Sequence, residues 1–424
     1  MTIFYKIPEP NSGARPSWVR SLFKTVDDFK KIAAVVVKAI GRDNLPADKP
    51  TWHAEDIVAV LTYAWIRGVS PDRASDKLNK LAIKEGKFVP KTFADGRHSR
   101  AFPHQTQVND WLALLSVKMA VKLGQAVFGV VLRIAKRKKL LPRNVVIEYD
   151  MTLCGYWGRR RDIYIKGTTQ VKGAKYARQY HAAVIHAWGL SLYVALDHIA
   201  KGRSKDVFLL DTTRWLKSLG FKVKWALADR EYYSYGVLSG MKTLGTNVIV
   251  PAKDYAQLEV AKEAYLLGRK GRVQSFWVAT GGKKGAKTKC ARCWLVLNSD
   301  GSHPLSVLRW AIRQEIASVA AASREIFGLI TTAAPQGHRR SFPERILELY
   351  KMRWQIETAF REQKVKHCPW RSDIDATQLV DKLGRTVLQD FWQLARKVDP
   401  REDELSLDIF RDEFVDAATC RMNM

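Results

Sequence analysis

The chain has 424 residues, 46% of them hydrophobic, and 71 Lys and Arg against 42 Asp and Glu give it a formal net charge of +29. This length predicts two or three domains, and the hydrophobic content excludes a disordered or fibrous chain. So positive a chain is expected to act on a polyanion. Nucleic acid is favoured, because contacts with many phosphates require many Lys and Arg side chains.

The sequence also bears on location. Its longest apolar runs, such as 32–37 and 126–132, are far shorter than the roughly 20 residues of a membrane span. The first residues contain no apolar segment of an export signal. Five Cys without regular spacing fit a reducing compartment. We therefore expect a cytoplasmic, nucleoid-associated protein that has no membrane partner.

Residues 1–140 are expected to form a helical DNA-binding domain. Apolar residues recur at helical spacing within 29–36, 57–64 and 108–115. Before the last of these runs stand Gln105 and Gln107, whose amides suit adenine edges. This segment therefore favours the opening of a DNA-recognition helix, although a capped and solvated helix end has the same pattern.

Residues 141–252 are expected to form the first part of an α/β catalytic core with a mixed sheet. Three strand-like runs precede a helix, a strand, a second helix and a last strand, an order that predicts a short antiparallel meander at one side. The expected strands cover 144–150, 181–188, 192–199, 221–229 and 247–251, and the expected helices cover 204–219 and 232–244.

Residues 253–324 interrupt this pattern and are expected to form a β-rich basic insertion. Strand-like runs at 273–278 and 293–297 flank a Gly- and Lys-rich tip, which predicts a long basic hairpin. The core resumes at 325–395 with a strand at 326–332. Residues 396–424 form an acidic tail, since 401–416 holds seven acidic and two basic residues.

A helix predicted from Ser341 to about His367, opened by a Ser341–Glu344 capping box, carries an unusual stripe. Tyr350, Arg353, Glu357 and Lys364 fall within an arc of about 60° at 3.6 residues per turn, and Arg361 joins them. One carboxylate flanked by cations and a phenol suits a metal-bound phosphate. An exposed, salt-bridged helix face has the same spacing.

Two further carboxylates favour the phosphate interpretation. Asp150 and Asp229 each end a strand-like run, and sites in α/β sheets form at the carboxyl ends of strands. Together with Glu357 they provide three hard oxygen ligands of the kind that Mg²⁺ takes, and Mn²⁺ can substitute. Two such ions would support an in-line phosphoryl transfer.

These motifs resemble a known family. The tetrad Tyr350-x2-Arg353-x3-Glu357-x6-Lys364 is similar to the Tyr-Arg-Glu-Lys signature of the insertion-sequence-four family of prokaryotic DDE transposases. Asp150-Met-Thr and Asp229-Arg-Glu-Tyr-Tyr-Ser look like that family's two Asp motifs, although many relatives have Gly at the position of Glu231. The resemblance covers about 144–367 and implies a ribonuclease-H-like fold with a β-rich insertion between the second Asp and the Glu.

The resemblance also implies an activity. The enzyme would bind terminal inverted repeats, cleave DNA with divalent metal ions held by Asp150, Asp229 and Glu357, and transfer the 3′-OH to a target. A homodimer would bring two ends together, with Arg353, Lys364 and Tyr350 on the end phosphates. Two alternatives remain: an inactive, transposase-derived DNA-binding protein, and a structure-specific nuclease with the same fold.

Other residues carry weaker signals. Arg159 and Arg160 stand in a basic stretch after Asp150 and are expected to contact DNA phosphates. Cys290 and Cys293 have zinc-like spacing without a second pair, so ordinary strand thiols are favoured. Relatives grip the DNA end with the insertion, where Trp277 or Trp294 could meet a base, although a Trp in a strand usually belongs to the core. His181 and His186 lie five apart on one strand and point to opposite faces.

Overall fold

A computed structural model describes thirteen parts of the chain: 52, 54–84, 86, 88–94, 96, 98–159, 162–168, 173–253, 255–279, 289–299, 303–335, 341–353 and 374–398. Several sequence predictions lie outside these residues: the helix at 29–36, the tip of the basic hairpin, Arg160, Glu357, Arg361, Lys364 and nearly all of the acidic tail.

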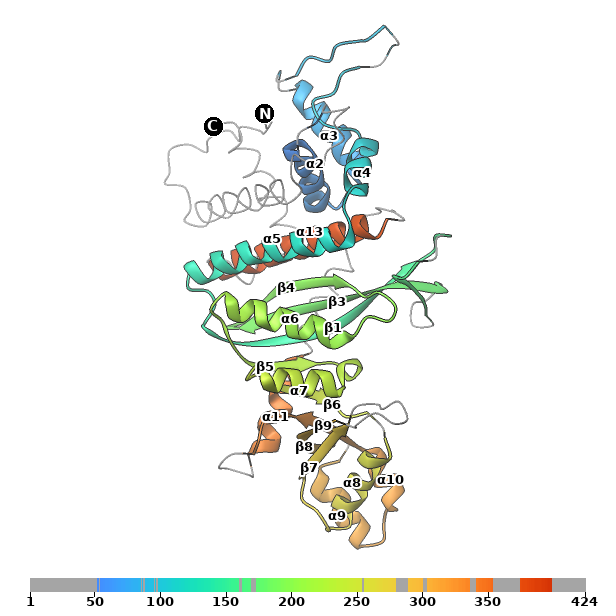
Figure 1. The fold of residues 1–424 in the computed structure, drawn as a ribbon, viewed down its shortest axis with the longest axis vertical. Coiled ribbons are helices and arrows are strands. Elements are labelled where there is room, and N and C mark those ends of the chain that lie inside the picture. Colours follow the sequence, from blue (N-terminus) through green and yellow to red (C-terminus); the bar gives the residue numbers. More distant parts are fainter. Residues whose placement is uncertain are drawn as a thin grey trace.

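The described N-terminal residues are helical, as expected (Figure 1). Three short helices lie at one end of the molecule, and the long helix α5 lies between them and the sheet beside a C-terminal helix, α13. The bounds are α2 Ala54–Arg67, α3 Pro71–Lys84, α4 Gln105–Ala113, α5 Val117–Arg137 and α13 Asp375–Val398.

No single helix in the described residues is long and apolar enough to cross a membrane. The pair α4 and α5 reaches the required length and composition only when both helices are taken together, across a bend of 100°.

The centre of the molecule is a mixed sheet whose described strands number nine. The order β4-β3-β1-β5-β6 places an antiparallel meander beside two strands parallel to β1, which is the ribonuclease-H-like arrangement expected from the sequence. The bounds are β1 Asn144–Tyr156, β2 Ile165–Gly167, β3 Tyr176–Ala187, β4 Leu190–His198, β5 Lys222–Ala228 and β6 Asn247–Pro251.

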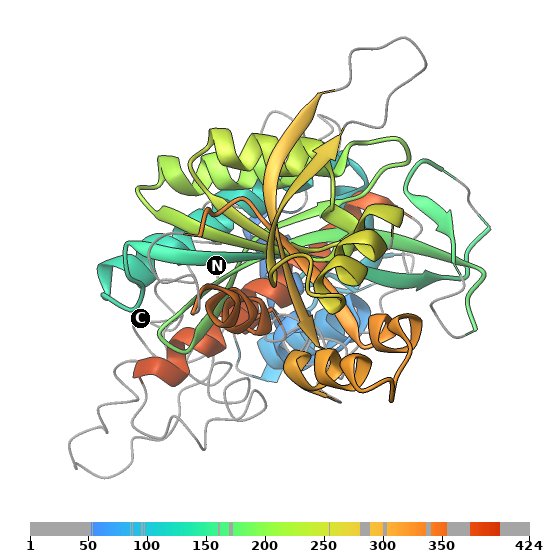
Figure 2. The same ribbon diagram turned by 90° about the horizontal axis from the view of Figure 1, so that it is seen from below.

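Helices lie on both faces of this sheet (Figure 2), and the central strands β3, β4 and β6 are buried on both sides, whereas β7 is exposed on one side. On one face lie α6 (Lys205–Ser218) and α7 (Tyr235–Thr243), close to the predicted ranges. On the other face α5 and α13 cover β4, and α11 (Phe342–Lys351) covers β6 and β8. Phe342 and Ile346 of α11 pack on Leu227, Ile249 and Leu329 of three strands.

The insertion differs from the expectation of a β-rich unit. The predicted hairpin is present as β7 (Val273–Ala279) and β8 (Cys290–Ser299), which extend the central sheet through β9 (Ile326–Thr331). The described insertion also holds three helices, of 11, 9 and 6 residues. These are α8 (Ala256–Leu266), α9 (Leu305–Arg313) and α10 (Val319–Arg324), so "β-rich" is wrong for this segment.

Candidate active site

Asp150 and Asp229 lie at neighbouring positions of two parallel strands. β1 and β5 pair in register up to Tyr149 and Ala228, and each aspartate is the next residue along its strand. Because neighbouring strands lie about 4.8 Å apart, this register brings two residues far apart in sequence to the same edge of the β1–β5 pair. The fold therefore brings together the first two acids of the predicted triad.

The prediction that Asp150 ends its strand was wrong. β1 continues to Tyr156, and Asp150 itself pairs with Ala182 of β3. What ends before Asp150 is the pairing with β5, since β5 stops at Ala228 and Asp229 caps the short 3₁₀ turn Arg230–Tyr232. Asp150 thus sits where the pairing with the neighbouring strand β5 ends.

Both carboxylates accept hydrogen bonds from the next backbone amide. The N–H of Met151 donates to Oδ1 of Asp150 at 2.7 Å, and the N–H of Arg230 donates to Oδ1 of Asp229 at 2.6 Å. The side chain of Asp150 keeps 12% of its exposure, and its Oδ2 lies 3.9 Å from the Arg353 guanidinium. The two acids are therefore oriented by backbone hydrogen bonds, and their oxygens are of the kind that bind a cation.

Tyr350 of α11 and Arg353, which lies just beyond the end of that helix at Lys351, reach the same site. Burial raises the pKa of Tyr350 to about 12; the Arg353 cation opposes that rise, and the negative charges of Asp229 and Glu148 add to it. Arg353 lies over the Tyr350 ring at 5.6 Å from its centroid. The structure therefore places the described members of the tetrad, Tyr350 and Arg353, beside both aspartates.

The start of α11 differs from the prediction. The side chain of Ser341 makes no capping hydrogen bond, and Glu344 pairs with Arg272 instead of returning to the helix start. The prediction of a capping box was therefore wrong. The helix is oriented by its apolar contacts with the sheet. Glu357, Arg361 and Lys364 follow α11 in the sequence and lie outside the described residues.

Sequence reasoning missed a pair of buried hydrogen bonds that hold the backbone of Asp150. The hydroxyl of Tyr232, from the turn that Asp229 caps, donates to the backbone oxygen of Asp150 at 3.2 Å. Nδ1 of His181 lies 2.6 Å from the same hydroxyl. Burial lowers the pKa of His181 to about 3, aided by Lys205, Arg203 and Lys166, so its ring is neutral and Nδ1–H donates to Tyr232. The motif Asp-Arg-Glu-Tyr contains this tyrosine, but the sequence does not show where its hydroxyl points.

A buried, hydrogen-bonded pair lies on the same face of β1 as Asp150. Glu148, two residues earlier and fully buried, has its Oε2 2.5 Å from Nε2 of His186, whose Nδ1 is 3.0 Å from the Ser191 hydroxyl. Burial lowers the pKa of His186 to about 4, so a neutral ring donates to Glu148 and accepts from Ser191. His181 and His186 do point to opposite faces, as their spacing predicted.

Other predicted DNA contacts lie away from the aspartates. Arg159 is exposed and follows the end of β1, and Tyr156 alone is about 20 Å along the strand from Asp150 at 3.3 Å per residue. Gln105 and Gln107 belong to α4, in the helical end of the molecule (Figure 1). Oε1 of Gln107 accepts from the backbone N–H of His104 and completes a capping box.

The two cysteines of the insertion do not face each other. Cys290 is exposed, and Cys293, three residues later on β8, is fully buried, with its pKa raised to about 11 by burial. Among the residues that the structure describes, no three His, Cys, Asp or Glu side chains gather to hold a metal ion. The predicted third acid, Glu357, is not among those residues.

Asp150 and Asp229 nevertheless fit a hard divalent cation. Both are carboxylates, both stand at one edge of the paired strands, and Oδ1 of each accepts a backbone hydrogen bond. Carboxylate oxygens with open positions beside them are what Mg²⁺ takes while keeping water and phosphate ligands. This donor set therefore suits a divalent ion.

A family model described as "Transposase DDE domain" matches residues 161–380, more than half of the chain. The chain belongs to the transposase DDE domain family. The matched part of this DDE domain contains Asp229, Tyr350, Arg353 and Glu357, and it begins after Asp150. The family is thus established by sequence, independently of the site geometry.

Two solved structures are similar to this DDE protein in part. One is a cryo-EM structure of the piggyBac transposase synaptic complex with hairpin DNA, with 10% identity, a TM-score of 0.47, and coverage of 96% of this chain and 81% of that chain. The other is a Drosophila P element transposase strand transfer complex, with 10% identity, a TM-score of 0.27, and coverage of 88% and 80%. No curated protein matches the chain.

Proposed function

We propose that this DDE protein is the DNA transposase of an insertion sequence of the insertion-sequence-four type. It binds terminal inverted repeats, cleaves them with the help of divalent metal ions, and joins the freed 3′-OH to target DNA. Two copies bring two ends together as a homodimer, and the protein works in the cytoplasm on the nucleoid. The net charge of +29 supports DNA as the partner.

One observation carries the proposal: Asp150 and Asp229 stand side by side in the register of β1 and β5, and Tyr350 of α11 and Arg353 after it bring a phenol and a guanidinium to the same place. A buried ion pair that served stability alone would need one acid and one cation. Two adjacent acids suit a metal ion that binds a phosphodiester. The cation and the neutral phenol beside them suit the negative charge of that phosphodiester.

Asp150, Asp229 and Glu357 hold Mg²⁺ in the proposed mechanism, and Mn²⁺ can replace it. When bound, the ions activate the attacking oxygen and stabilise the leaving oxygen. Arg353 holds a phosphate of the transposon end, with Arg361 and Lys364 beside it. Tyr350 donates a hydrogen bond to a phosphate oxygen, because a pKa of about 12 keeps its hydroxyl protonated at neutral pH. Arg159 and Arg160 contact DNA further away.

The test is strand cleavage and joining on DNA that carries the inverted repeats flanking the coding frame, with Mg²⁺ present. Asp229→Asn should lower the cleavage rate by at least about a thousandfold, as removal of an essential catalytic group does. Glu231→Gln is the matched control, because it removes one negative charge from the same turn. Its carboxylate pairs with Lys205 at 2.6 Å, and it should keep activity within about twofold.

The outcomes separate this proposal from its rivals. Equal activity of wild type and Asp229→Asn contradicts it. A wild type that binds the repeats but neither cleaves nor joins them is an inactive derivative. Cleavage without joining of pre-nicked ends indicates a nuclease.

A further inference from the structure

The helix α3 presents a row of cations that the proposed active site does not use. Arg73, Lys77, Lys80 and Lys84 are all exposed and stand at helical offsets of 0, 4, 7 and 11, which places them within an arc of about 60°. None of the four side chains makes an ion pair with any residue that the structure describes. We call these four residues the α3 stripe.

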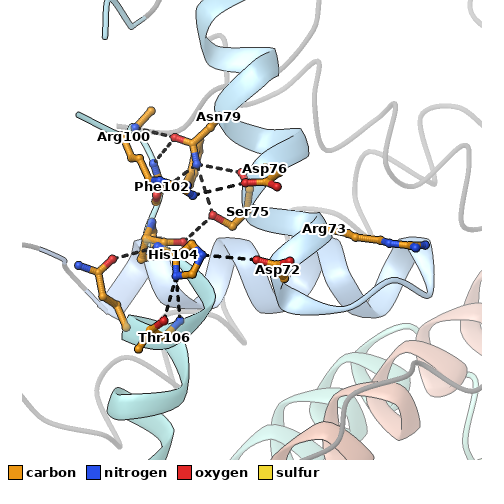
Figure 3. A network of polar contacts seen from close by, with 12 residues as sticks. Asp72, Arg73, Ser75, Asp76, Asn79, Arg100, Phe102, His104 and Thr106 are labelled. Atoms are coloured by element: carbon orange, nitrogen blue, oxygen red, sulfur yellow. Dashed lines mark hydrogen bonds and ion pairs between the residues drawn. The ribbon is translucent and has the colours of Figure 1, made fainter. Parts of the chain in front are cut away.

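The acids of the same helix do not neutralise the stripe. Asp76 pairs with Arg100 at 3.4 Å, and Asp72 lies 3.5 Å from Nε2 of His104. Both partners come from the segment that leads into α4. Figure 3 shows these pairs on one side of α3, with Arg73 pointing away from them. Each carboxylate thus has a cationic or ring N–H partner of its own, and the positive charge of the stripe is left for another ligand.

A buried network holds α3 at a fixed angle behind the stripe. The amide oxygen of Asn79 accepts from the backbone N–H of Ala101 at 2.7 Å and of Phe102 at 3.0 Å. Its amide nitrogen donates to the oxygen of Phe102 at 3.2 Å, and the Ser75 hydroxyl donates to the oxygen of Pro103 at 2.7 Å (Figure 3). These bonds fasten the segment before α4 to the buried side of α3, so the exposed side is presented rigidly.

A short turn connects α2 to α3. α2 ends at Arg67 and α3 begins at Pro71, joined by a turn in which Gly68 adopts φ +63°, a left-handed conformation that Gly tolerates. A short Gly-containing turn is the connection that helix-turn-helix units have, in which the second helix enters the major groove, and αα-hairpins have it as well. In this unit the second helix is α3, ahead of α4 in the chain.

An exposed loop follows α3 in the chain. It forms a small bridge between Thr92 and His98, closed by a hydrogen bond from the Lys91 backbone N–H to the Ser99 hydroxyl at 2.7 Å. Phe93, at the turn of this bridge, is 54% exposed, and Lys91 is exposed as well.

We propose that the α3 stripe docks this end of the molecule on duplex DNA, with α3 in the major groove and its cations on the flanking phosphates. The stripe spans about 16 Å at 1.5 Å per residue, and the groove is about 12 Å wide, so cations at both ends of α3 reach phosphate rows. This inference rests on the proposed function for its partner and adds where that partner is held. Duplex DNA is the occupant because its regular phosphates match a straight row of cations.

The experiment measures binding of a random-sequence duplex of about 30 base pairs to the full chain without divalent metal, over about 0.05 to 0.2 M salt. Lys77→Ala with Lys80→Ala should weaken binding roughly tenfold or more at the higher salt and reduce the salt slope by about two. Lys118→Ala with Lys122→Ala removes the same charge from exposed positions of α5 and should change affinity by less than about threefold. Alanine favours helix, so both double variants should fold.

A third variant, Lys77→Arg with Lys80→Arg, keeps the charge and should keep the binding. Equal losses in the α3 and α5 variants, or no loss in either, overturn the inference. The two proposals fail separately. Full duplex binding by the α3 variant, with cleavage that still depends on Asp229, removes only the docking role. α3-dependent binding by a wild type that never cleaves removes only the transposase function.

Discussion

The two faces of β1 have different surroundings, although their residues alternate along one strand. On one face the Tyr149 hydroxyl donates to the oxygen of Leu209 at 3.0 Å, lies 2.7 Å from the Thr213 hydroxyl, and is closed in by α6. On the other face Glu148 and Asp150 point toward the side covered by α11, where Tyr350 and Arg353 arrive. The first face has its polar groups satisfied by helix α6, whereas the second gathers charge at the strand edge.

This difference shows how one strand can serve both stability and chemistry. The α6 face fixes the height and angle of β1 through packing and neutral hydrogen bonds. The α11 face then holds the Asp150 carboxylate at a defined position. A change at Tyr149 should therefore affect unfolding, and a change at Asp150 should affect phosphate chemistry.

The largest expected effect separates the two faces directly. Asp150→Asn should lower Mg²⁺-dependent cleavage by at least about a thousandfold, because one hard oxygen charge is lost where metal and phosphate meet. Tyr149→Phe, one residue away, should leave cleavage within about threefold and cost about 1 kcal/mol of unfolding free energy from its lost hydrogen bonds. Cleavage assays and urea unfolding of both variants check this. Equal loss of activity in the two variants would contradict the division.

The next effect concerns the buried pair on the α11 face. His186→Leu removes the ring N–H that Glu148 accepts at 2.5 Å and should cost on the order of 3 kcal/mol, because the carboxylate is fully buried. Ser191→Ala removes only a neutral bond to the same ring and should cost about 1 kcal/mol. Urea unfolding measures both. A cost for Ser191→Ala as large as that for His186→Leu would show that Glu148 does not depend on the ring.

A smaller effect is expected on the free energy of unfolding when the pH is lowered. His198 lies between the rings of Tyr164 and Tyr180, each 4.5 Å away, and neither ring nitrogen has a hydrogen-bond partner in the described structure. Burial lowers the pKa of His198 to about 3, and Arg178, Lys166 and Lys382 also lower it while Asp162 opposes them. The unfolded chain takes up this proton near pH 6.5, so stability falls as pH drops from there toward 3.

His198→Phe removes this proton uptake and keeps the ring stack. Its unfolding free energy should therefore fall by about 2 kcal/mol less than that of wild type between pH 7 and pH 5. Urea unfolding at the two pH values measures the difference, which cancels the contributions of other groups. Parallel losses in the two proteins would mean that His198 titrates in the fold as it does in the unfolded chain.

The sequence predicted the core of the fold well, for reasons that are local. The strand 247–251 and the helix near 204–219 follow from periodicity and turn residues, and the structure has them at Asn247–Pro251 and Lys205–Ser218. The adjacency of Asp150 and Asp229 depends on the parallel pairing of β1 with β5, which joins segments far apart in the sequence.

The missed features depend on contacts between distant segments. α13 was not predicted as a core helix because its buried face includes polar residues such as Asp381 and Asp390, which find partners in Trp65 and in the backbone of Tyr193. The Ser341–Glu344 capping box satisfied the local pattern, yet Arg272 of the insertion takes the Glu344 side chain. No local pattern encodes either partner.

The smallest expected effect concerns Tyr232, which links the two faces of β1. Tyr232 lies on the α6 side with His181 and Phe208, but its hydroxyl reaches the backbone of Asp150, so it connects the α6 face to the residue proposed to bind metal. Tyr232→Phe removes that bond and the one from His181, and should cost about 1–2 kcal/mol of stability and lower cleavage about tenfold through a shifted Asp150. His181→Phe should give the same stability loss with a smaller loss of cleavage, since the bond to Asp150 remains. Titrating Mg²⁺ in the cleavage assay separates the causes, because a shifted ligand raises the Mg²⁺ requirement, whereas a merely less stable fold does not.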